Sequence, residues 1–321
     1  MPERKVIEVD LGGTHIRVGV VGESGSLDHH HQVATESKLG YQWVIERIAE
    51  LIDATANQAS LDASTPVGVA SPGPLNPRTG TVLYTPNPPG WRNVPLVELL
   101  ESRVERKVYL ANDGNCGALG EIRFGRARGV NDLIYFALGT GVGGGIVSGG
   151  KLIDGVRGLG AEVGHLGVAM DGPRCTCGSI GRLESYVSGW AIKREAEAVA
   201  TTTDGDRIRE LAGDGDIHPG IVARAADDGD MAARLILVRA GRALGAAMGA
   251  LTNIFNPAMI VVGGGVPAIG EHLVGPARET LLAYSFADMR EDLSIAYSSL
   301  GNDTGVYGAA SLALEESALD S

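Results

Sequence analysis

The chain has 321 residues, which is enough for two domains with substantial hydrophobic cores. Apolar residues make up 44% of it and aromatic residues 5%, and the 47 glycines predict a globular fold rich in tight turns. The formal net charge of −12 argues against nucleic acid and anionic membranes as the main partners, because both repel an acidic surface.

In the first half of the chain, strands and helices alternate. β-Branched apolar runs predict strands over residues 6–10, 16–21, 66–71 and 107–113. Apolar residues at helical spacing predict helices over residues 42–59 and 95–104. The proline-rich segment 71–95 is predicted to be an ordered, functional loop, because loops of this length inside a domain are usually functional or disordered.

The second half repeats this plan. Strands are predicted over residues 132–138, 145–148 and 259–264. Helices are predicted over residues 188–200, 204–212, 230–255, 268–284 and 304–317. This alternation predicts an α/β protein, and the sequence leaves open which domain receives the last helix.

Two glycine-rich bends are built alike. Residues 10–14 read DLGGT and residues 139–145 read GTGVGGG, and each bend lies between two predicted strands. Glycine lets the backbone approach an anion closely, with several N–H groups pointing inward. One such bend in each half predicts two halves that close on a polyphosphate.

The second bend also matches a dinucleotide-binding pattern. Gly139, Gly141 and Gly144 fit G-x-G-x-x-G, which binds a dinucleotide where the glycines lead from a strand into a helix. Here they lead into GIVSGGKLI, which alternates and turns like a hairpin, so this interpretation is disfavoured. A second alternative stays open, that the glycines serve only a tight turn.

The pair Asn112-Asp113 ends a predicted strand and precedes a helical segment. A carboxylate at a helix N-terminus meets the positive end of the helix dipole and unpaired N–H groups, which keep it ionised. Asp113 is therefore a candidate general base. The alternative is that Asp113 only caps the helix, a position that aspartate favours.

Further along, Glu162, His165 and Glu184 lie among glycines. Carboxylates accept paired hydrogen bonds from adjacent hydroxyls, so this group suits a polyhydroxy ligand, although exposed glutamates without a role are common. Cys175 and Cys177, with His165, supply three of the four ligands of a structural zinc site.

Eight motifs occur together and in order, and through them the chain resembles the ROK family of sugar kinases, to which bacterial glucokinases belong. They are DLGGT at 10–14, SPGPLN at 71–76, TPNPPGWRNVPL at 85–96, AND at 111–113, LGTGVGGG at 138–145, EVGH at 162–165, CTCGSIGRLE at 175–184 and FNPAMIVVGGG at 255–265. The resemblance implies an actin-like (ribonuclease H-like) ATPase fold with two α/β domains and a cleft between them. The domains are expected at 1–111 plus 305–321 (small) and at 112–304 (large).

The resemblance also implies an activity, the ATP- and Mg²⁺-dependent phosphorylation of the 6-hydroxyl of a hexose, glucose above all. Asp113 then resembles the catalytic base. The residues that match sugar contacts of the family are Gly73, Asn87, Asn112, Asp113, Glu162, His165 and Glu184. Those that match nucleotide contacts are Asp10 near Mg²⁺, and Gly12, Gly13, Thr14, Thr140, Gly141, Gly263, Gly264 and Gly265.

The chain departs from the family in its zinc block, which usually reads C-x-C-G-x-x-G-C-x-E. The last cysteine is replaced by Arg182, so His165, Cys175 and Cys177 remain as metal ligands. We expect zinc to be lost or weakly bound, because structural zinc sites are nearly always four-coordinate. Zinc held with a water or carboxylate as fourth ligand stays open, and Cys116 is a disfavoured substitute.

Several alternatives within the family remain. An N-acetylglucosamine or N-acetylmannosamine kinase, or a non-catalytic sugar-sensing member, shares these motifs, and polyphosphate is an alternative donor. Repressors of the family carry a DNA-binding segment, for which we expect no room before residue 10. The family implies a homo-oligomer, dimer or tetramer.

The cellular location is predicted from the N-terminal segment, the hydropathy and the cysteines of the sequence. The N-terminal MPERKVIEVD has no apolar signal core, and we expect no membrane span. The three cysteines do not make a disulfide framework, so we expect a cytoplasmic protein.

Overall fold

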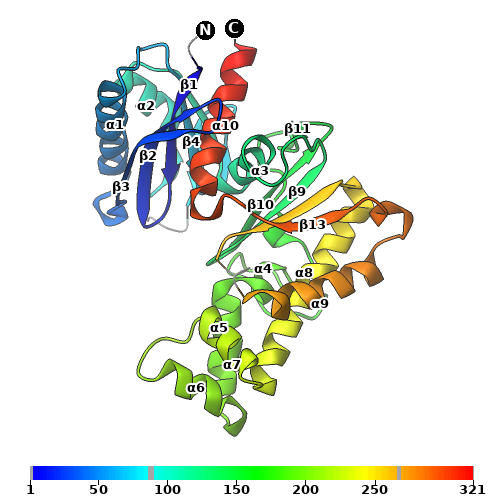
Figure 1. The fold of residues 1–321 in the computed structure, drawn as a ribbon. Helices are drawn as coiled ribbons and strands as arrows, with labels where there is room; N and C mark the ends of the chain where they lie inside the picture. The colour runs from blue at the N-terminus through cyan, green and yellow to red at the C-terminus, as the bar shows by residue number, and fades with distance from the viewer. Residues whose placement is uncertain (1–2, 86–89, 266–268, 321) are drawn as a thin grey trace. The chain divides into compact units, whose positions relative to one another are not determined.

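The computed structural model describes residues 3–85, 90–265 and 269–320, in which strands and helices alternate along the chain (Figure 1). The chain forms two compact units. Unit 1 contains Met1–Val130, Gly145–Ala161 and Ser299–Ser321, and unit 2 contains Asn131–Gly144 and Glu162–Ser298. Residues 112–130 and 145–161 are thus counted with unit 1, whereas the predicted large domain starts at residue 112. The predicted domain boundaries stay a prediction.

A five-stranded sheet forms the centre of unit 1. Its order is β3-β2-β1-β4-β8. The strands are β1 (Lys5–Leu11), β2 (His15–Gly22), β3 (Leu27–Ala34), β4 (Val67–Ser71) and β8 (Val108–Asn112). β2 is antiparallel to both β1 and β3, while β1, β4 and β8 are parallel. The four predicted strands are confirmed, and β3 was not predicted because its sequence, LDHHHQVA, is polar and largely exposed.

Helices cover both faces of this sheet. Helices α1 (Tyr41–Gln58) and α2 (Leu96–Val104) pack on one face, and α10 (Thr304–Leu319) packs on the other, beside α3 (Asp113–Arg123). The predicted helices 42–59 and 95–104 are confirmed. The last helix therefore returns to unit 1, which answers the question that the sequence left open.

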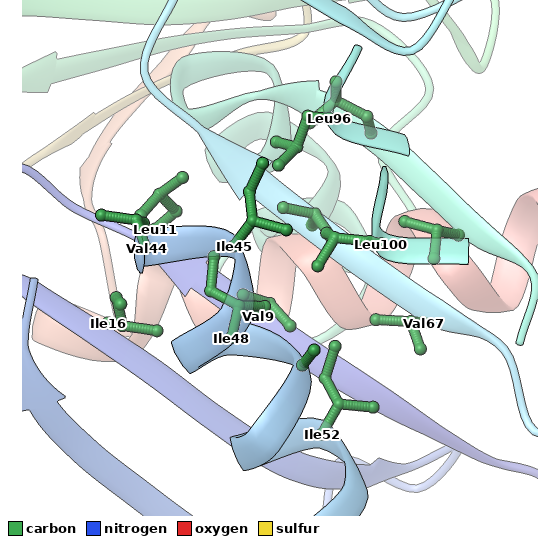
Figure 2. Packing of buried hydrophobic residues seen from close by; sticks show 14 of the residues in the cluster. Val9, Leu11, Ile16, Val44, Ile45, Ile48, Ile52, Val67, Leu96 and Leu100 are labelled. Carbon is green, nitrogen blue, oxygen red and sulfur yellow. The ribbon is translucent and has the colours of Figure 1, made fainter. Parts of the chain in front are cut away.

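Strand β1 has apolar side chains on both faces of the sheet, and helices bury them on each side. Ile7 and Val9 belong to the core cluster under α1 and α2, while Val6 packs with α10 residues, because successive side chains of a strand point to opposite faces. On α1, Val44, Ile45, Ile48 and Ile52 recur at helical spacing and form the apolar side that meets the sheet (Figure 2).

The proline-rich segment contains a small antiparallel sheet of its own. Its strands, in the order β5-β6-β7, are β5 (Leu75–Asn76), β6 (Thr81–Tyr84) and β7 (Arg92–Val94). Trp91 is 2% exposed, and its ring meets that of Tyr41 edge-on at 6.3 Å between centroids. The prediction of an ordered segment is confirmed over the described part, and its strands are too short for periodicity to reveal.

A second five-stranded sheet has the order β11-β10-β9-β12-β13. Its strands are β9 (Leu133–Leu138), β10 (Val142–Ser148), β11 (Lys151–Leu152), β12 (Met259–Gly263) and β13 (Ser294–Tyr297). β12 runs parallel to β9 and to β13. The division into units falls within β10. The predicted strands are confirmed, with β10 starting three residues earlier, and the short β13 was not predicted.

The helices of unit 2 follow in sequence. They are α4 (Glu184–Val187), α5 (Gly189–Ala200), α6 (Asp206–Ala212), α7 (Pro219–Asp227), α8 (Met231–Phe255) and α9 (Glu271–Tyr284). The four predicted helices of this region are confirmed. Gly241, Gly245 and Gly249 lie four residues apart on α8, and a Cβ on any of them would collide with α9. This glycine row therefore lets the two helices pack closely.

Helix α8 is long and apolar enough, by length and composition, to cross a membrane. In the protein, 72% of its most apolar 18-residue stretch is buried, as in a core helix of a globular domain. Its apolar character is therefore accounted for by packing inside unit 2.

Candidate active site

Asn112 and Asp113 lie where β8 meets α3. Asn112 is the N-cap of α3, with its backbone at φ −64° and ψ 144°, and its side chain accepts a hydrogen bond from Gly114 N at 2.9 Å by Oδ1. Asp113 is the first residue of the helix and is exposed, and its Oδ1 accepts from Gly114 N at 2.8 Å. The alternative that Asp113 is merely the N-cap is therefore wrong, because Asn112 has that position. The carboxylate of Asp113 meets the positive end of the helix dipole.

Gly73 lies directly against this strand end. A Cβ on Gly73 would lie 2.8 Å from Nδ2 of Asn112, so glycine lets the SPGP loop approach the amide. The neighbouring strands place Ser71 opposite Asn112 in the parallel register of β4 and β8. Gly73, Asn112 and Asp113 are thus brought together within unit 1. The predicted residue Asn87 lies outside the described residues.

Glu162, His165 and Glu184 belong to unit 2. Glu162 immediately precedes a 3-10 helix, Val163–His165, and Glu184 is the first residue of α4. Burial raises the pKa of Glu162, His165 opposes that shift, and Glu184 adds to it. The charges of His165 and Glu184 therefore both act on the carboxyl of Glu162.

The carboxylate of Glu184 is held at both oxygens. Its Oε2 accepts from Val142 N at 3.1 Å, and its Oε1 accepts from Thr176 Oγ1 at 3.0 Å and from Cys175 Sγ at 3.5 Å. A Cβ on Gly141 would lie 2.8 Å from Oε2. Glu184 therefore links the second glycine turn to the loop that carries the cysteines, and no sequence motif predicted this link.

The three candidate metal ligands converge. The ligand atoms of His165, Cys175 and Cys177 all lie within 4.8 Å of one another, with 3.8 Å between Cys175 Sγ and His165 Nδ1. This arrangement fits a metal ion with three protein ligands. At the position of the missing cysteine, Arg182 donates from Nη2 to Ser179 Oγ at 3.4 Å.

The thiols of Cys177 in unit 2 and Cys116 in unit 1 differ in environment. A backbone hydrogen bond from Ser179 is the largest of the effects that lower the pKa of Cys177, and the charge of Arg182 contributes to the same shift. Cys116, the disfavoured substitute ligand, is buried in the apolar core of unit 1 with Ala70 and Ala309, and burial raises its pKa well above the ordinary value.

Three glycines have no steric reason to be glycine. Among the described residues, a Cβ on Gly13, Gly139 or Gly265 would meet no atom within 4 Å, and none of the three has a positive φ. No other glycine whose surroundings the structure describes has both properties. Each of the three lies in a different predicted nucleotide-binding segment. An open, unstrained glycine leaves space for a ligand to reach the backbone N–H groups.

The glycines next to these three do have structural reasons to be glycine. A Cβ on Gly12 would lie 3.0 Å from His15 O, and Gly264 has a φ of +88° and lies against the backbone of Leu138. Gly263 lies against the ring of Tyr135. Thr14 closes the first turn, where its carbonyl accepts from Thr35 N at 2.9 Å, and Thr140 lies within the second turn. Gly139 was absent from the predicted ligand contacts, although it begins the second glycine motif.

Asp10 is the last residue but one of β1 and lies beside the guanidinium of Arg17. Its Oδ2 lies 3.2 Å from Arg17 Nη1, and a Cβ on Gly305 would lie 2.5 Å from its Oδ1. Burial raises the pKa of Asp10 and Arg17 opposes that shift. Mg²⁺ is commonly held by one or two carboxylates together with phosphates and water, so this single, partly exposed carboxylate fits such a role.

The dinucleotide interpretation of the second glycine turn is wrong. Strand β10 follows that turn directly, and a dinucleotide fingerprint requires a helix there. The first glycine turn adjoins the SPGP loop, since Gly12, Gly13, Ser71 and Pro72 line one small cavity of about 10 Å³.

A larger cavity lies elsewhere in unit 1. Its volume is about 890 Å³, and residues of α2, β8, β11 and α10 line it. None of the predicted site residues lines this cavity, so the candidate active site rests on the residues described above and not on cavity size.

Comparison with known proteins gives consistent results over the whole chain. The model of the ROK family matches residues 6–316. Glucokinase of Thermotoga maritima is 39% identical over 317 residues, which are 98% of this chain and 99% of that protein. Both chains are thus covered almost completely.

Two solved structures agree with this result. The ROK hexokinase from Thermus thermophilus has a TM-score of 0.83 at 32% identity and covers 98% of this chain and 99% of its own. A ROK family glucokinase from Streptomyces griseus, in complex with glucose and AMPPNP, has a TM-score of 0.81 at 35% identity and covers 97% of this chain and 99% of its own.

Proposed function

This chain belongs to the ROK family, and from that premise we propose that it is an ATP-dependent kinase that phosphorylates the 6-hydroxyl of glucose. Its fold is the actin-like ATPase fold with two α/β domains. The glucokinases to which it is similar match it along nearly their whole length, and one of them was solved with glucose and an ATP analogue.

The observation that carries the proposal is the position of Asp113. Its exposed carboxylate stands in the first turn of α3, while Asn112 takes over the task of capping the helix. A general base for a sugar hydroxyl must be ionised and accessible, and this position favours both. Asp113 is therefore the proposed base.

The reaction proceeds by positioning and charge stabilisation. Asp113 accepts the proton of the 6-hydroxyl while the hydroxyl oxygen bonds to the γ-phosphorus, and the bond to the β–γ bridging oxygen breaks to release ADP. Backbone N–H groups around Gly13, Gly139 and Gly265 hold the phosphates and the adenosine end. Asp10 would hold Mg²⁺, which supplies neutralising charge to the phosphates when bound.

The sugar is recognised by side chains that accept hydrogen bonds and by one that donates them. Glu162, His165 and Glu184 accept hydrogen bonds from hydroxyls near C1 and C2, and Asn112 donates to neighbouring hydroxyls. The loop at Gly73 supplies close backbone contact, and Asn87 is the further contact that the family pattern gives. A raised pKa of Glu162 implies that glucose binding weakens as the pH falls through it, because a protonated carboxyl loses acceptor capacity.

We propose that zinc is bound weakly. The trio of His165, Cys175 and Cys177 fits a metal ion, but the guanidinium of Arg182 offers no lone pair in place of the fourth cysteine. Protein purified without chelators is expected to contain much less than one equivalent of zinc. Elemental analysis checks this expectation, and one equivalent that survives dialysis against EDTA contradicts it.

We also propose that the enzyme works in the cytoplasm as a homo-oligomer, dimer or tetramer. The cytoplasm supplies ATP, and the one long apolar helix is mostly buried within unit 2. Light scattering after size exclusion checks the assembly, and a monomer at micromolar concentration contradicts it.

A coupled ADP-release assay tests the function. The panel contains glucose, mannose, fructose, allose, N-acetylglucosamine and N-acetylmannosamine with Mg²⁺-ATP. We expect the highest kcat/KM with glucose. Activity confined to the acetylated sugars would overturn the substrate, and no activity on any sugar would overturn the kinase assignment in favour of a sugar sensor.

A further inference from the structure

The loop with the two cysteines contains a threonine that contacts Glu184. Thr176 donates from Oγ1 to Glu184 Oε1 at 3.0 Å, and it is the one hydroxyl donor to that carboxylate among the described residues. Thr176 is exposed, while Glu184 is only 9% exposed. The hydroxyl therefore reaches from the surface to a buried carboxylate.

The donors around Glu184 are distributed unevenly. Oε1 accepts from Thr176 Oγ1 and from Cys175 Sγ, while among the described residues Oε2 accepts only from Val142 N. A carboxylate oxygen has two acceptor positions, so Oε1 is filled and Oε2 keeps one. By this count of donors, Oε2 is the oxygen that can accept a further hydrogen bond.

We propose that Thr176 is a positioning residue, which fixes the rotation of the Glu184 carboxylate and thereby presents Oε2 to a sugar hydroxyl. This inference rests on the proposed sugar-binding role of Glu184. The sulfur donor at 3.5 Å is a weaker partner than an oxygen donor at 3.0 Å. Without the hydroxyl, Val142 N and Cys175 Sγ remain as donors and hold the carboxylate less firmly, so part of the sugar-binding energy is lost in ordering it.

The test uses Thr176→Val, which keeps the shape of the side chain and removes the hydroxyl, and Thr176→Ser, which keeps the hydroxyl. Thr201→Val is the matched control, because the hydroxyl of Thr201 is also exposed in unit 2 but bonds only to the carbonyl of Ala198. Glucose Kd is measured by calorimetry without ATP, and kcat, both KM values and Tm are measured alongside.

Thr176→Val is expected to raise glucose Kd and KM about three- to tenfold, the size of effect that follows when binding must order a side chain. The KM for ATP and, within about twofold, kcat are expected to stay unchanged, while Tm falls slightly because the valine removes a hydrogen bond to a buried carboxylate. Thr176→Ser and Thr201→Val are expected to bind glucose within about twofold of the wild type.

Wild-type glucose affinity in Thr176→Val would overturn the inference, as would a serine variant as weak as the valine variant. Glu184→Gln separates the positioning role of Thr176 from the sugar-binding role of Glu184. If Glu184→Gln loses glucose affinity and Thr176→Val does not, the positioning role alone fails. If Glu184→Gln binds glucose normally, the proposed sugar-binding role of Glu184 fails, and the inference fails with it.

Discussion

Asn112 and Asp113 show at the scale of single residues how two neighbouring polar side chains separate a structural task from a chemical one. Asn112 caps α3, and Asp113 is left exposed in the first helical turn. From the residues alone, Asp113 was a candidate cap as well as a candidate base. The backbone of Asn112, which is extended and outside the helix, identifies Asn112 as the cap, and the role of Asp113 as the base is a proposal.

A substitution at Gly13 can test the contact with ATP without a change in protein stability that would confuse the result. Gly13→Ala places its Cβ in open space at an unstrained φ, so Tm is expected to stay at the wild-type value. If a phosphate approaches that backbone, the methyl group raises the KM for ATP about tenfold and leaves glucose Kd unchanged. Steady-state kinetics and calorimetry measure both.

Gly12→Ala is the matched comparison. Its Cβ would lie 3.0 Å from His15 O, so this variant is expected to lose stability as well as affinity for ATP. A Gly13→Ala enzyme with an unchanged KM for ATP would contradict the nucleotide role of the first glycine turn.

Glu8 is a residue whose ionisation opposes folding. It is fully buried on β1 opposite Gly19 of β2, and neither carboxylate oxygen has a hydrogen-bond partner among the described residues. Burial raises the pKa of Glu8 well above its ordinary value of 4.5, and the charge of Asp10 adds to the shift. The folded state therefore holds this proton more tightly than the unfolded state does.

The stability that this proton contributes is present below pH 4.5 and is lost as the pH rises through the raised pKa of the folded state. Glu8→Gln stays neutral, so it is expected to unfold with about 1–3 kcal/mol more free energy than the wild type at pH 8. The two proteins should converge near pH 4. Urea denaturation at both pH values measures this, and a glutamine variant that is less stable at pH 8 would refute it.

At the scale of elements, the α8–α9 pair depends on glycines for close packing. A Cβ on Gly245 would collide with the carbonyl of Ala277 and would lie 2.7 Å from Thr280 Cβ. Gly245→Ala is therefore expected to destabilise unit 2 by about 1–3 kcal/mol, because overpacking forces the helices apart.

Gly275→Ala on α9 is the control for that substitution. Its Cβ would meet only Glu271 Oε2, at 3.6 Å, so the usual gain of about 0.5–1 kcal/mol for alanine in a helix is expected. Thermal unfolding of both variants decides the point. Equal effects of the two substitutions would show that helix propensity, and not packing, sets the response.

Elements with strong periodicity could be predicted from the sequence, and elements that depend on tertiary packing could not. α1 and β1 have clear apolar patterns and lie where they were predicted. β3 is polar, and β13 has four residues, so neither has a pattern that distinguishes it from a loop. α7 was not predicted, and it is a short helix of nine residues that begins at Pro219.

The candidate site divides in the same way. Asp113, Glu162 and Glu184 could be selected by residue type and by their place after strands and glycines. The bonds from Thr176 and Val142 to Glu184 join residues that are 8 and 42 positions apart. Such contacts form when loops fold against each other, and no local sequence pattern predicts them.

For the molecule as a whole, eight short motifs in order predicted more than any single one. The similarity to known proteins in sequence and in structure extends over nearly the entire chain, which confirms the family and the α/β architecture. The path of the chain through the two units was not predictable in detail. α10 returns to unit 1, and residues 145–161 belong there too, because contacts far apart in sequence decide membership.

The most direct test of the kinase mechanism is glucose phosphorylation by Asp113→Asn compared with glucose binding by the same variant. Asparagine keeps the shape of the side chain and cannot accept the hydroxyl proton, so kcat is expected to fall about 10²- to 10⁴-fold while glucose Kd stays within a few-fold of the wild type. A variant that binds glucose and turns over at the wild-type rate would contradict the assignment of Asp113 as the base, and with it the account of this protein as a sugar kinase built around that residue.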